Sequence, residues 1–302
     1  MMRELPLDLV RTLLAVVDEG TFDAAARVLH VTPGAVSQRV KALEQRTGRV
    51  LLVRSRPVRP TESGEVIARF ARQLARLEQD AHAALGMDGS AESARLSIAV
   101  NADSLATWFL PALTRVPDGL RPSYELHRED ESNTAQLLRE GLVMAAVTSS
   151  PDAVAGCLVR ALGGMRYVPA AAPAFAGRWF GAGRDVPLRE VIADAPVVTF
   201  DRHDDLQDAF VRELRHGGRA SARRHLMPTS EGFVTAVTAG LGWGMVPAAQ
   251  AEPLLRAGRL VRLAPDRDVT VRLYWQQWRL DSPALTAVAD AVAATAAEAL
   301  DP

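Results

Sequence analysis

The stretch HVTPGAVSQRVKALEQRTG predicts a helix with one apolar face and one polar face. Thr32 followed by Pro33 is a typical helix start, because the threonine hydroxyl caps the first turn and proline needs no hydrogen-bonded N–H there. Val36, Val40 and Leu43 recur at helical spacing and form a stripe that must be buried. The opposite face carries small, hydrogen-bonding or cationic residues: Gly34, Ser37, Gln38, Lys41 and Gln45.

Two shorter helical patterns precede this helix. An apolar stripe runs from Leu9 to Val17 and stops at Gly20, and Thr21 then caps a second helix that begins at Phe22. Helices in this order predict a helix-turn-helix, whose last helix enters the major groove of DNA. Gln, Ser and Lys side chains contact base edges or phosphates there. The alternative is an ordinary surface helix with its polar face in water.

Residues 27–59 are the most basic part of a chain whose net charge is −1. They hold eight Arg or Lys against one acid, Glu44. Such an excess is typical of a nucleic-acid surface, although it also occurs on a solvated basic face. The β-prone Val50 to Val53 and the arginine–proline run after them predict a short two-stranded wing. The candidate DNA-binding residues of helix and wing are Thr32, Gly34, Ser37, Gln38, Lys41, Arg54, Arg56 and Arg59.

A long amphipathic helix is predicted from about Glu62 to Leu85, with Thr61 as its cap. Its apolar positions are spaced by three and four residues, which is the pattern of a seam that needs a partner helix. The simplest partner is the same helix of a second copy, so we expect a homodimer or a homotetramer. The seam residues are Ile67, Phe70, Leu74 and Leu77.

From Arg95 onward, strand-like and helical stretches alternate, which predicts an α/β architecture with largely parallel sheets. The strand candidates include RLSIAV, SYELHR, VMAAVT, APVVTF, RRHLMP and WGMVP. Ligands bind such folds at the carboxyl ends of the strands. The candidate ligand-binding residues at or near these ends are Asn101, Asp103, Ser104, Trp108, Asp130, Thr148, Asp201, Asp204, Asp205, Ser230 and Glu231.

The chemistry of this set favours a basic amino acid. Its acids would pair with ammonium groups, and Ser104 at a helix start would hold a carboxylate. Trp108 would flank an aliphatic stem or a cation. The alternatives are structural, with Asp103 and Ser230 as helix caps and Trp108 as a core residue.

The stretch TFDAAARVLHVTPGAVSQRVKALEQRTGRVLLVR resembles the winged helix-turn-helix of LysR-type transcriptional regulators, and the long helix resembles their dimerisation linker. Leu52 stands where that family usually has Phe, and residues 60–64, PTESG, replace a more usual Leu-Thr-x-Ala-Gly. Both departures lie in or beside the wing, so they affect the expected wing contacts more than the fold. The segments VNADSLATWFLPAL, FDRHDD, TSEGFV and GLGWGMVP resemble the ArgP/LysG subgroup, whose members sense basic amino acids.

The resemblance implies a regulator that binds double-stranded DNA and responds to lysine, arginine or histidine, and that controls genes of amino acid export or metabolism. It implies an effector domain of two lobes, built like periplasmic binding proteins. The expected division is a winged domain (1–61), a dimerisation helix (62–86), a hinge (87–94), lobe I (95–165 and 266–302) and lobe II (166–265). Another small-molecule effector is the alternative reading.

Other functional classes are disfavoured. The chain contains no G-x-S-x-G, P-loop or H-E-x-x-H motif, and its six histidines lack ligand spacing, so we expect no catalysis, cofactor or metal. A solute-binding protein would leave residues 1–85 unexplained. The single cysteine, Cys157, excludes a disulfide framework and fits a cytoplasmic location. No apolar run approaches the roughly 20 residues of a membrane span.

Overall fold

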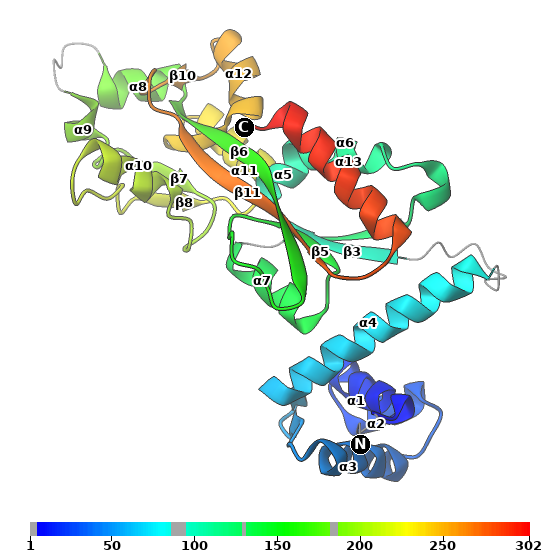
Figure 1. Ribbon diagram of the computed structural model, residues 1–302. Helices are drawn as coiled ribbons and strands as arrows, with labels where there is room; N and C mark the ends of the chain where they lie inside the picture. The colour runs from blue at the N-terminus through cyan, green and yellow to red at the C-terminus, as the bar shows by residue number, and fades with distance from the viewer. Residues whose placement is uncertain (1–4, 86–94, 129–130, 182–186) are drawn as a thin grey trace.

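The structure is a computed structural model that describes residues 5–85, 95–128, 131–181 and 187–302. Figure 1 shows three parts: a small domain at the bottom, a long helix, and a larger domain of two lobes. Among the described residues, no helix is long and apolar enough to cross a lipid bilayer.

The small domain, which we call the winged domain, contains three helices and two short strands. These are α1 (Leu7–Glu19), α2 (Phe22–Val28), α3 (Pro33–Thr47), β1 (Leu52–Val53) and β2 (Arg59–Pro60). The two strands pair antiparallel. The predicted helix-turn-helix and two-stranded wing are therefore confirmed.

Local signals determine where these helices begin and end. The N–H of Ala24 donates to Oγ1 of Thr21 over 3.1 Å, and the N–H of Ala35 donates to Oγ1 of Thr32 over 3.2 Å. Each cap satisfies one of the amide groups that a helix start leaves without a partner. Gly48 ends α3 in the left-handed conformation that favours glycine.

The apolar stripe of α3 is buried as predicted. Val36, Val40 and Leu43 pack into one core with residues of α1 such as Leu13 and Val16. Burial of each such side chain contributes about 1.5–3 kcal/mol. This packing fixes which face of α3 points outward.

The long helix α4 (Glu62–Ala84) connects the winged domain to the larger domain. Arg72 donates from one guanidinium nitrogen to Asp18 of α1 and from another to the backbone carbonyl of Glu140. Arg76 is buried and donates to the carbonyl of Arg95 over 3.1 Å. These contacts join α4 to both of its neighbours.

The four residues expected to form the dimer seam on α4 differ in exposure within the single chain. Ile67 is buried in the core of the winged domain, so its side chain is not available to a partner helix. Phe70 and Leu77 are exposed, and Leu74 is half-buried.

In the larger domain, lobe I lies to the right in Figure 1. Its strands are β3 (Arg95–Val100), β4 (Ser123–Arg128) and β5 (Ala145–Thr148). Its helical segments are α5 (Ala102–Ser104), a π-helical turn η1 (Leu105–Phe109), α6 (Leu110–Thr114), a 3₁₀ turn η2 (Asp118–Leu120), α7 (Glu131–Glu140) and α13 (Pro283–Ala299). The predicted strand and helix order from residue 95 to residue 148 is confirmed.

Lobe II lies to the left in Figure 1. Its strands are β7 (Val197–Thr199), β8 (Arg224–Leu226), β9 (Gly244–Pro247) and β10 (Val261–Arg262). Its helices are α8 (Pro173–Phe180), α9 (Leu188–Val191), α10 (Leu206–Leu214), α11 (Ser230–Thr238) and α12 (Ala248–Arg256). The strand candidates APVVTF, RRHLMP and WGMVP correspond to β7, β8 and β9.

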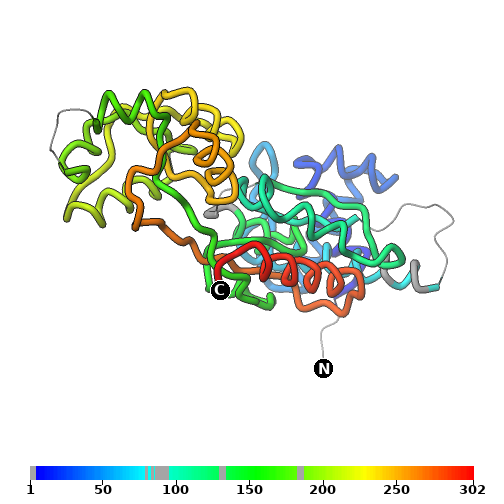
Figure 2. Tube along the Cα trace, turned by 90° about the horizontal axis from the view of Figure 1, so that it is seen from above, coloured from blue at the N-terminus to red at the C-terminus, as the bar shows by residue number. Residues whose placement is uncertain are grey.

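Two long strands, β6 (Cys157–Ala171) and β11 (Val269–Trp278), run through both lobes and join them. Figure 2 shows the lobes side by side, with these strands as the connection. They belong to a seven-stranded sheet of order β10-β6-β11-β5-β3-β4, in which β9 also pairs with β6.

The expectation of largely parallel sheets is wrong for this sheet. Strand β3 is parallel to β4 and to β5, but every pair that includes β6 or β11 is antiparallel. Strands β6 and β11, which supply these antiparallel pairs, were not predicted from the sequence.

The pairing of the two crossing strands is irregular near Gly163. The register between β6 and β11 shifts between Leu273 and Tyr274, and Gly163 has a φ of +132°. A side chain at Gly163 would meet the carbonyl oxygen of Asp301 at 2.7 Å, so the position requires glycine. The expected boundary between residues 165 and 166 therefore falls inside one continuous strand.

Candidate functional site

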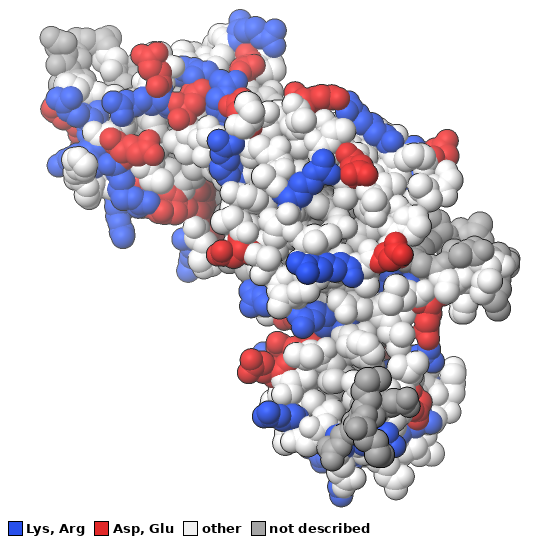
Figure 3. Space-filling view, in the orientation of Figure 1, with Lys and Arg blue, Asp and Glu red and all other residues white. Residues whose placement is uncertain are grey.

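The polar face of α3 is open to solvent. Gly34, Ser37, Gln38, Lys41 and Gln45 are all exposed, as is the capping residue Thr32. Figure 3 shows basic side chains at the lower edge of the molecule, where Figure 1 places α3. The wing arginines Arg54, Arg56 and Arg59 are also exposed. Helix and wing thus present hydrogen-bonding and cationic groups that can contact bases and phosphates.

A second candidate site is a cavity of about 490 Å³ with walls from both lobes. Lobe I contributes Asn101 and Asp103, and the crossing strand β6 contributes Tyr167. Lobe II contributes Phe200, most of the loop that follows it and the start of α10: Asp201, His203, Asp204, Asp205, Leu206 and Gln207. A volume of this size is typical of a site for a small molecule.

Asp103 is the lobe I carboxylate of this cavity. Its Oδ1 accepts a hydrogen bond of 2.7 Å from the hydroxyl of Ser230, and its Oδ2 accepts one of 2.9 Å from the hydroxyl of Tyr167. Burial raises the pKa of Asp103 above its usual value, the two hydroxyl donors lower it, and the charge of Glu231 raises it further. A cation beside Asp103 would reduce the cost of keeping this carboxylate charged.

The lobe II acids of the cavity hold their own loop in shape. Oδ2 of Asp204 accepts from the N–H of Phe200 over 2.7 Å, and its Oδ1 accepts from the N–H of Leu206 over 3.1 Å. Burial raises the pKa of Asp204, although these N–H donors lower it. Oδ1 of Asp201 accepts from the N–H groups of His203 and Asp204. Both acids line the cavity while they fix the loop.

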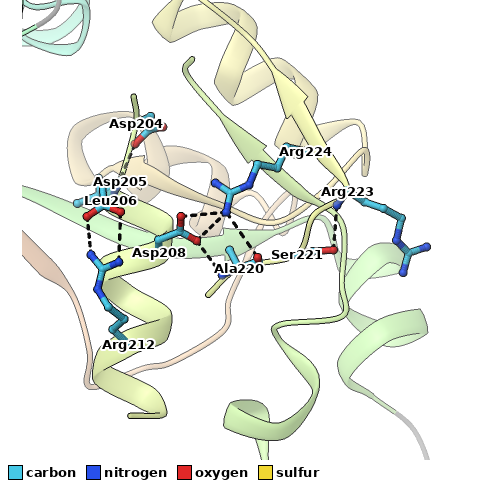
Figure 4. A network of polar contacts seen from close by, with 9 residues as sticks. All are labelled: Asp204, Asp205, Leu206, Asp208, Arg212, Ala220, Ser221, Arg223 and Arg224. Carbon is cyan, nitrogen blue, oxygen red and sulfur yellow. Dashed lines mark hydrogen bonds and ion pairs between the residues drawn. The ribbon is translucent and has the colours of Figure 1, made fainter. Parts of the chain in front are cut away.

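Asp205 also lines the cavity, but it is paired with Arg212. Figure 4 shows this pair beside a second one, in which Arg224 contacts both carboxylate oxygens of Asp208 at 2.7 and 2.9 Å. The guanidinium group of Arg212 already neutralises the charge of Asp205, so Asp205 would attract a ligand cation less strongly than Asp103.

Several residues predicted to bind the ligand lie away from this cavity. Ser104 is buried inside lobe I, and the hydroxyl of Thr148 accepts from the N–H of Ser150. Trp108 is buried against Phe109, and it lines a different cavity of about 460 Å³. Glu231 is exposed at the start of α11 and acts on the cavity through the charge that it places near Asp103. Asp130 lies outside the described residues.

Part of the cavity wall was not predicted from the sequence, namely Tyr167, Phe200, Gln207, Phe233 and Met245. Phe200, Phe233 and Met245 lie in segments identified from the sequence, but apolar residues that line a cavity are indistinguishable from core residues in a sequence. The Oε1 atom of Gln207 and the Oδ1 atom of Asn101 are buried and lack hydrogen-bond partners in the described part of the chain. Such acceptors beside a cavity are suited to a ligand that brings N–H groups.

Comparison with known proteins agrees with this division into two sites. Residues 7–65 match the bacterial regulatory helix-turn-helix proteins of the lysR family, and residues 89–297 match the LysR substrate binding domain. The chain belongs to the LysR family. It is therefore a transcriptional regulator with a DNA-binding and a small-molecule-binding domain, and it is not an enzyme. Among its described residues, no group of three or more His, Cys, Asp and Glu could hold a metal ion.

ArgP and LysG proteins of the LysR family match almost the whole chain. ArgP from Mycobacterium tuberculosis is 43% identical with a TM-score of 0.89, and the match covers 99% of each chain. Full-length LysG from Corynebacterium glutamicum with bound effector Arg is 39% identical with a TM-score of 0.84, over 99% of this chain and 100% of that one. The lysine export transcriptional regulatory protein LysG of C. glutamicum is 40% identical over 291 residues, which are 96% of this chain and 98% of the relative. The expected resemblance to the ArgP/LysG subgroup is confirmed.

Proposed function

We propose that this LysR-family regulator binds a basic amino acid, L-lysine or L-arginine, in the cavity between its lobes. The observation that carries the proposal is the charge of the cavity wall. Four aspartates, Asp103, Asp201, Asp204 and Asp205, line it, and only Asp205 among them is paired with an arginine in the described contacts. The described residues of the lining include no lysine or arginine. An acidic ligand would meet repulsion there, whereas a cationic ligand would find acceptors.

Asp103 is the strongest candidate for the contact with a ligand cation. Each of its oxygens accepts only one hydroxyl in the described contacts, so each retains capacity for a further donor. Asn101 Oδ1 would accept a second N–H of the same ligand. LysG with bound Arg, a relative that matches over its whole length, supports an amino acid of this charge.

We propose that the regulator binds DNA through α3 and the wing. Gln38 and Lys41 are the central groups of the exposed face of α3, and the wing arginines would bind phosphates. Pairing of two α4 helices through Phe70, Leu74 and Leu77 would place two winged domains on one DNA site, in a dimer or tetramer. We infer a cytoplasmic location from the DNA target, and control of amino acid export or metabolism genes from the name of the lysine export relative.

The deciding experiment is calorimetric titration of the full-length protein with L-lysine, L-arginine, L-histidine and L-norleucine. Norleucine has the length of lysine without the terminal ammonium group. Loss of one charge-assisted hydrogen bond costs about 1.5–3 kcal/mol, which is a tenfold to hundredfold loss of affinity. We expect norleucine to bind more weakly than lysine or arginine by that factor.

Two variants assign the contact. Asp103→Asn should also bind lysine about tenfold to a hundredfold more weakly than the wild type does. The control is Asp118→Asn, which changes an exposed acid of lobe I outside the cavity and should bind lysine as the wild type does. Equal binding of norleucine and lysine would contradict the charge argument. Failure of all basic amino acids to bind would leave a LysR-family regulator of another small molecule.

A further inference from the structure

The turn that begins α11 in lobe II touches lobe I at two points. The hydroxyl of Ser230 donates to Asp103 over 2.7 Å, and Nη1 of Arg128 donates to the backbone carbonyl of Pro228 over 2.8 Å. Arg128 is the last residue of β4, at the edge of the seven-stranded sheet. Two residues of lobe I thus hold one three-residue turn of lobe II.

These two contacts differ in their relation to the cavity. Asp103 lines it, so a ligand in the cavity would change the surroundings of Asp103 directly. Arg128 does not line the cavity, and its only role across the lobes in the described contacts is the bond to Pro228. A substitution at Arg128 would therefore change the contact between the lobes without changing the groups that line the cavity.

We propose that Arg128 is a positioning residue: with the Asp103–Ser230 pair it forms a latch that holds the two lobes in their closed arrangement. The latch raises the fraction of molecules in this arrangement, in which both lobes line the cavity. The apparent dissociation constant equals the intrinsic one divided by the fraction of competent molecules, so a closed resting state strengthens ligand binding. The part of the proposal that concerns affinity rests on the proposed function, and the part that concerns lobe spacing does not.

The test measures the distance between the lobes in the full-length protein. Nitroxide labels are attached at Ala294→Cys on α13 of lobe I and His216→Cys after α10 of lobe II, both exposed positions. The native Cys157 will not compete for the label, because it is buried and burial raises its pKa to about 11. Labelled chains are mixed with an excess of unlabelled chains so that distances within one chain dominate. Pulsed electron resonance then gives the distance distribution.

The comparison uses Arg128→Ala and a matched control, Arg121→Ala. Arg121 also donates to backbone carbonyls, those of Thr114 and Val116 at 3.0 Å, but both acceptors lie in lobe I. We expect Arg128→Ala to broaden the ligand-free distribution toward longer distances, and Arg121→Ala to leave it unchanged. Saturating L-arginine should return Arg128→Ala to the wild-type distribution.

The fraction of molecules with closed lobes also determines the apparent affinity for the ligand. Arg128→Ala should weaken binding of L-arginine by roughly twofold to tenfold, since fewer ligand-free molecules are closed. A ligand-free distribution of Arg128→Ala identical to that of wild type would overturn the latch, as would equal broadening by Arg121→Ala. If the wild type binds neither lysine nor arginine, the proposed ligand is wrong, and the ligand-free distances still decide whether the latch exists.

Discussion

Oε1 of Glu44, the single acid among residues 27–59, accepts a hydrogen bond of 2.9 Å from the backbone N–H of Leu51. Leu51 is buried at the start of the wing. The one negative charge in the basic stretch thus has a structural use, because it ties the wing to α3.

The Glu44 contact predicts the stability of the wing. Glu44→Ala leaves a buried N–H without an acceptor, which costs about 1–3 kcal/mol. Hydrogen exchange of the wing amides in the full-length protein should become faster by about fivefold to a hundredfold. Gln45→Ala, an exposed neighbour on α3, is the control and should not change exchange. Unchanged protection in Glu44→Ala would show that the wing is held by other contacts.

Gln38 is predicted to read a base in the major groove. Gln38→Ala should weaken binding to the specific operator by roughly 1–3 kcal/mol and weaken binding to random DNA less. Electrophoretic mobility shifts with both DNAs measure the two losses. Equal losses on both would mean that Gln38 contacts only the DNA backbone.

Lys41 is predicted to contact phosphate. Lys41→Ala should weaken binding to all DNA sequences and lower the slope of log affinity against log salt by about one unit. The control is Arg259→Ala, which removes an exposed cation of lobe II. An unchanged slope for Lys41→Ala is incompatible with a phosphate contact.

Leu77 is predicted to lie in the helix pair that forms the dimer. It is 42% exposed in the single chain, so a partner helix would bury it. Leu77→Glu would place like charges opposite each other and should lower the dimer fraction in sedimentation runs at low micromolar concentration. The control is Ala75→Glu, which adds the same charge at an exposed position on the opposite side of α4, because two residues at about 100° each turn the helix by half a circle. Ala75→Glu should leave the dimer intact, and a stable Leu77→Glu dimer would place the interface elsewhere.

The pKa of Asp103 predicts a pH dependence of ligand binding. Because burial raises this pKa, the ligand-free protein takes up a proton at Asp103 at a higher pH than an exposed aspartate would. The charged form binds a cation, so affinity for lysine should fall as the pH drops from 7 toward that raised pKa. Calorimetry at a series of decreasing pH values should show this fall in the wild type and a flatter profile in Asp103→Asn.

His203 also lines the cavity and provides the control for this pH profile. His203→Gln should therefore keep the part of the slope that belongs to Asp103. If His203→Gln removes the whole pH dependence, Asp103 does not control it.

The winged domain could be predicted from sequence because its signals are local. Thr21, Thr32, Gly20 and Gly48 each determine a helix end through contacts within a few residues. Because Val36, Val40 and Leu43 are buried, the opposite face of α3 is exposed, and the DNA-binding candidates of this helix lie together on that face.

The cavity could be predicted only in part, because its walls come together over long separations. Asp103 and Ser230 are 127 residues apart in sequence, and no local pattern pairs them. Tyr167 was missed because β6 contains the adjacent Gly163 and Gly164, which interrupt the alternation that marks a strand. Asp204 was correctly placed near a strand end, but its two backbone N–H donors depend on the loop conformation.

The double contact of Arg72, to Asp18 on one side and Glu140 on the other, gives α4 the mechanics of a lever. Both contacts are made by one residue, so a rotation of lobe I around Arg72 would be carried directly to the winged domain. Arg72 lies ten residues after Glu62, which gives an arm of about 15 Å at 1.5 Å per residue. A rotation of about 13° would then displace the start of α4 by roughly 3.4 Å, the rise of one base pair.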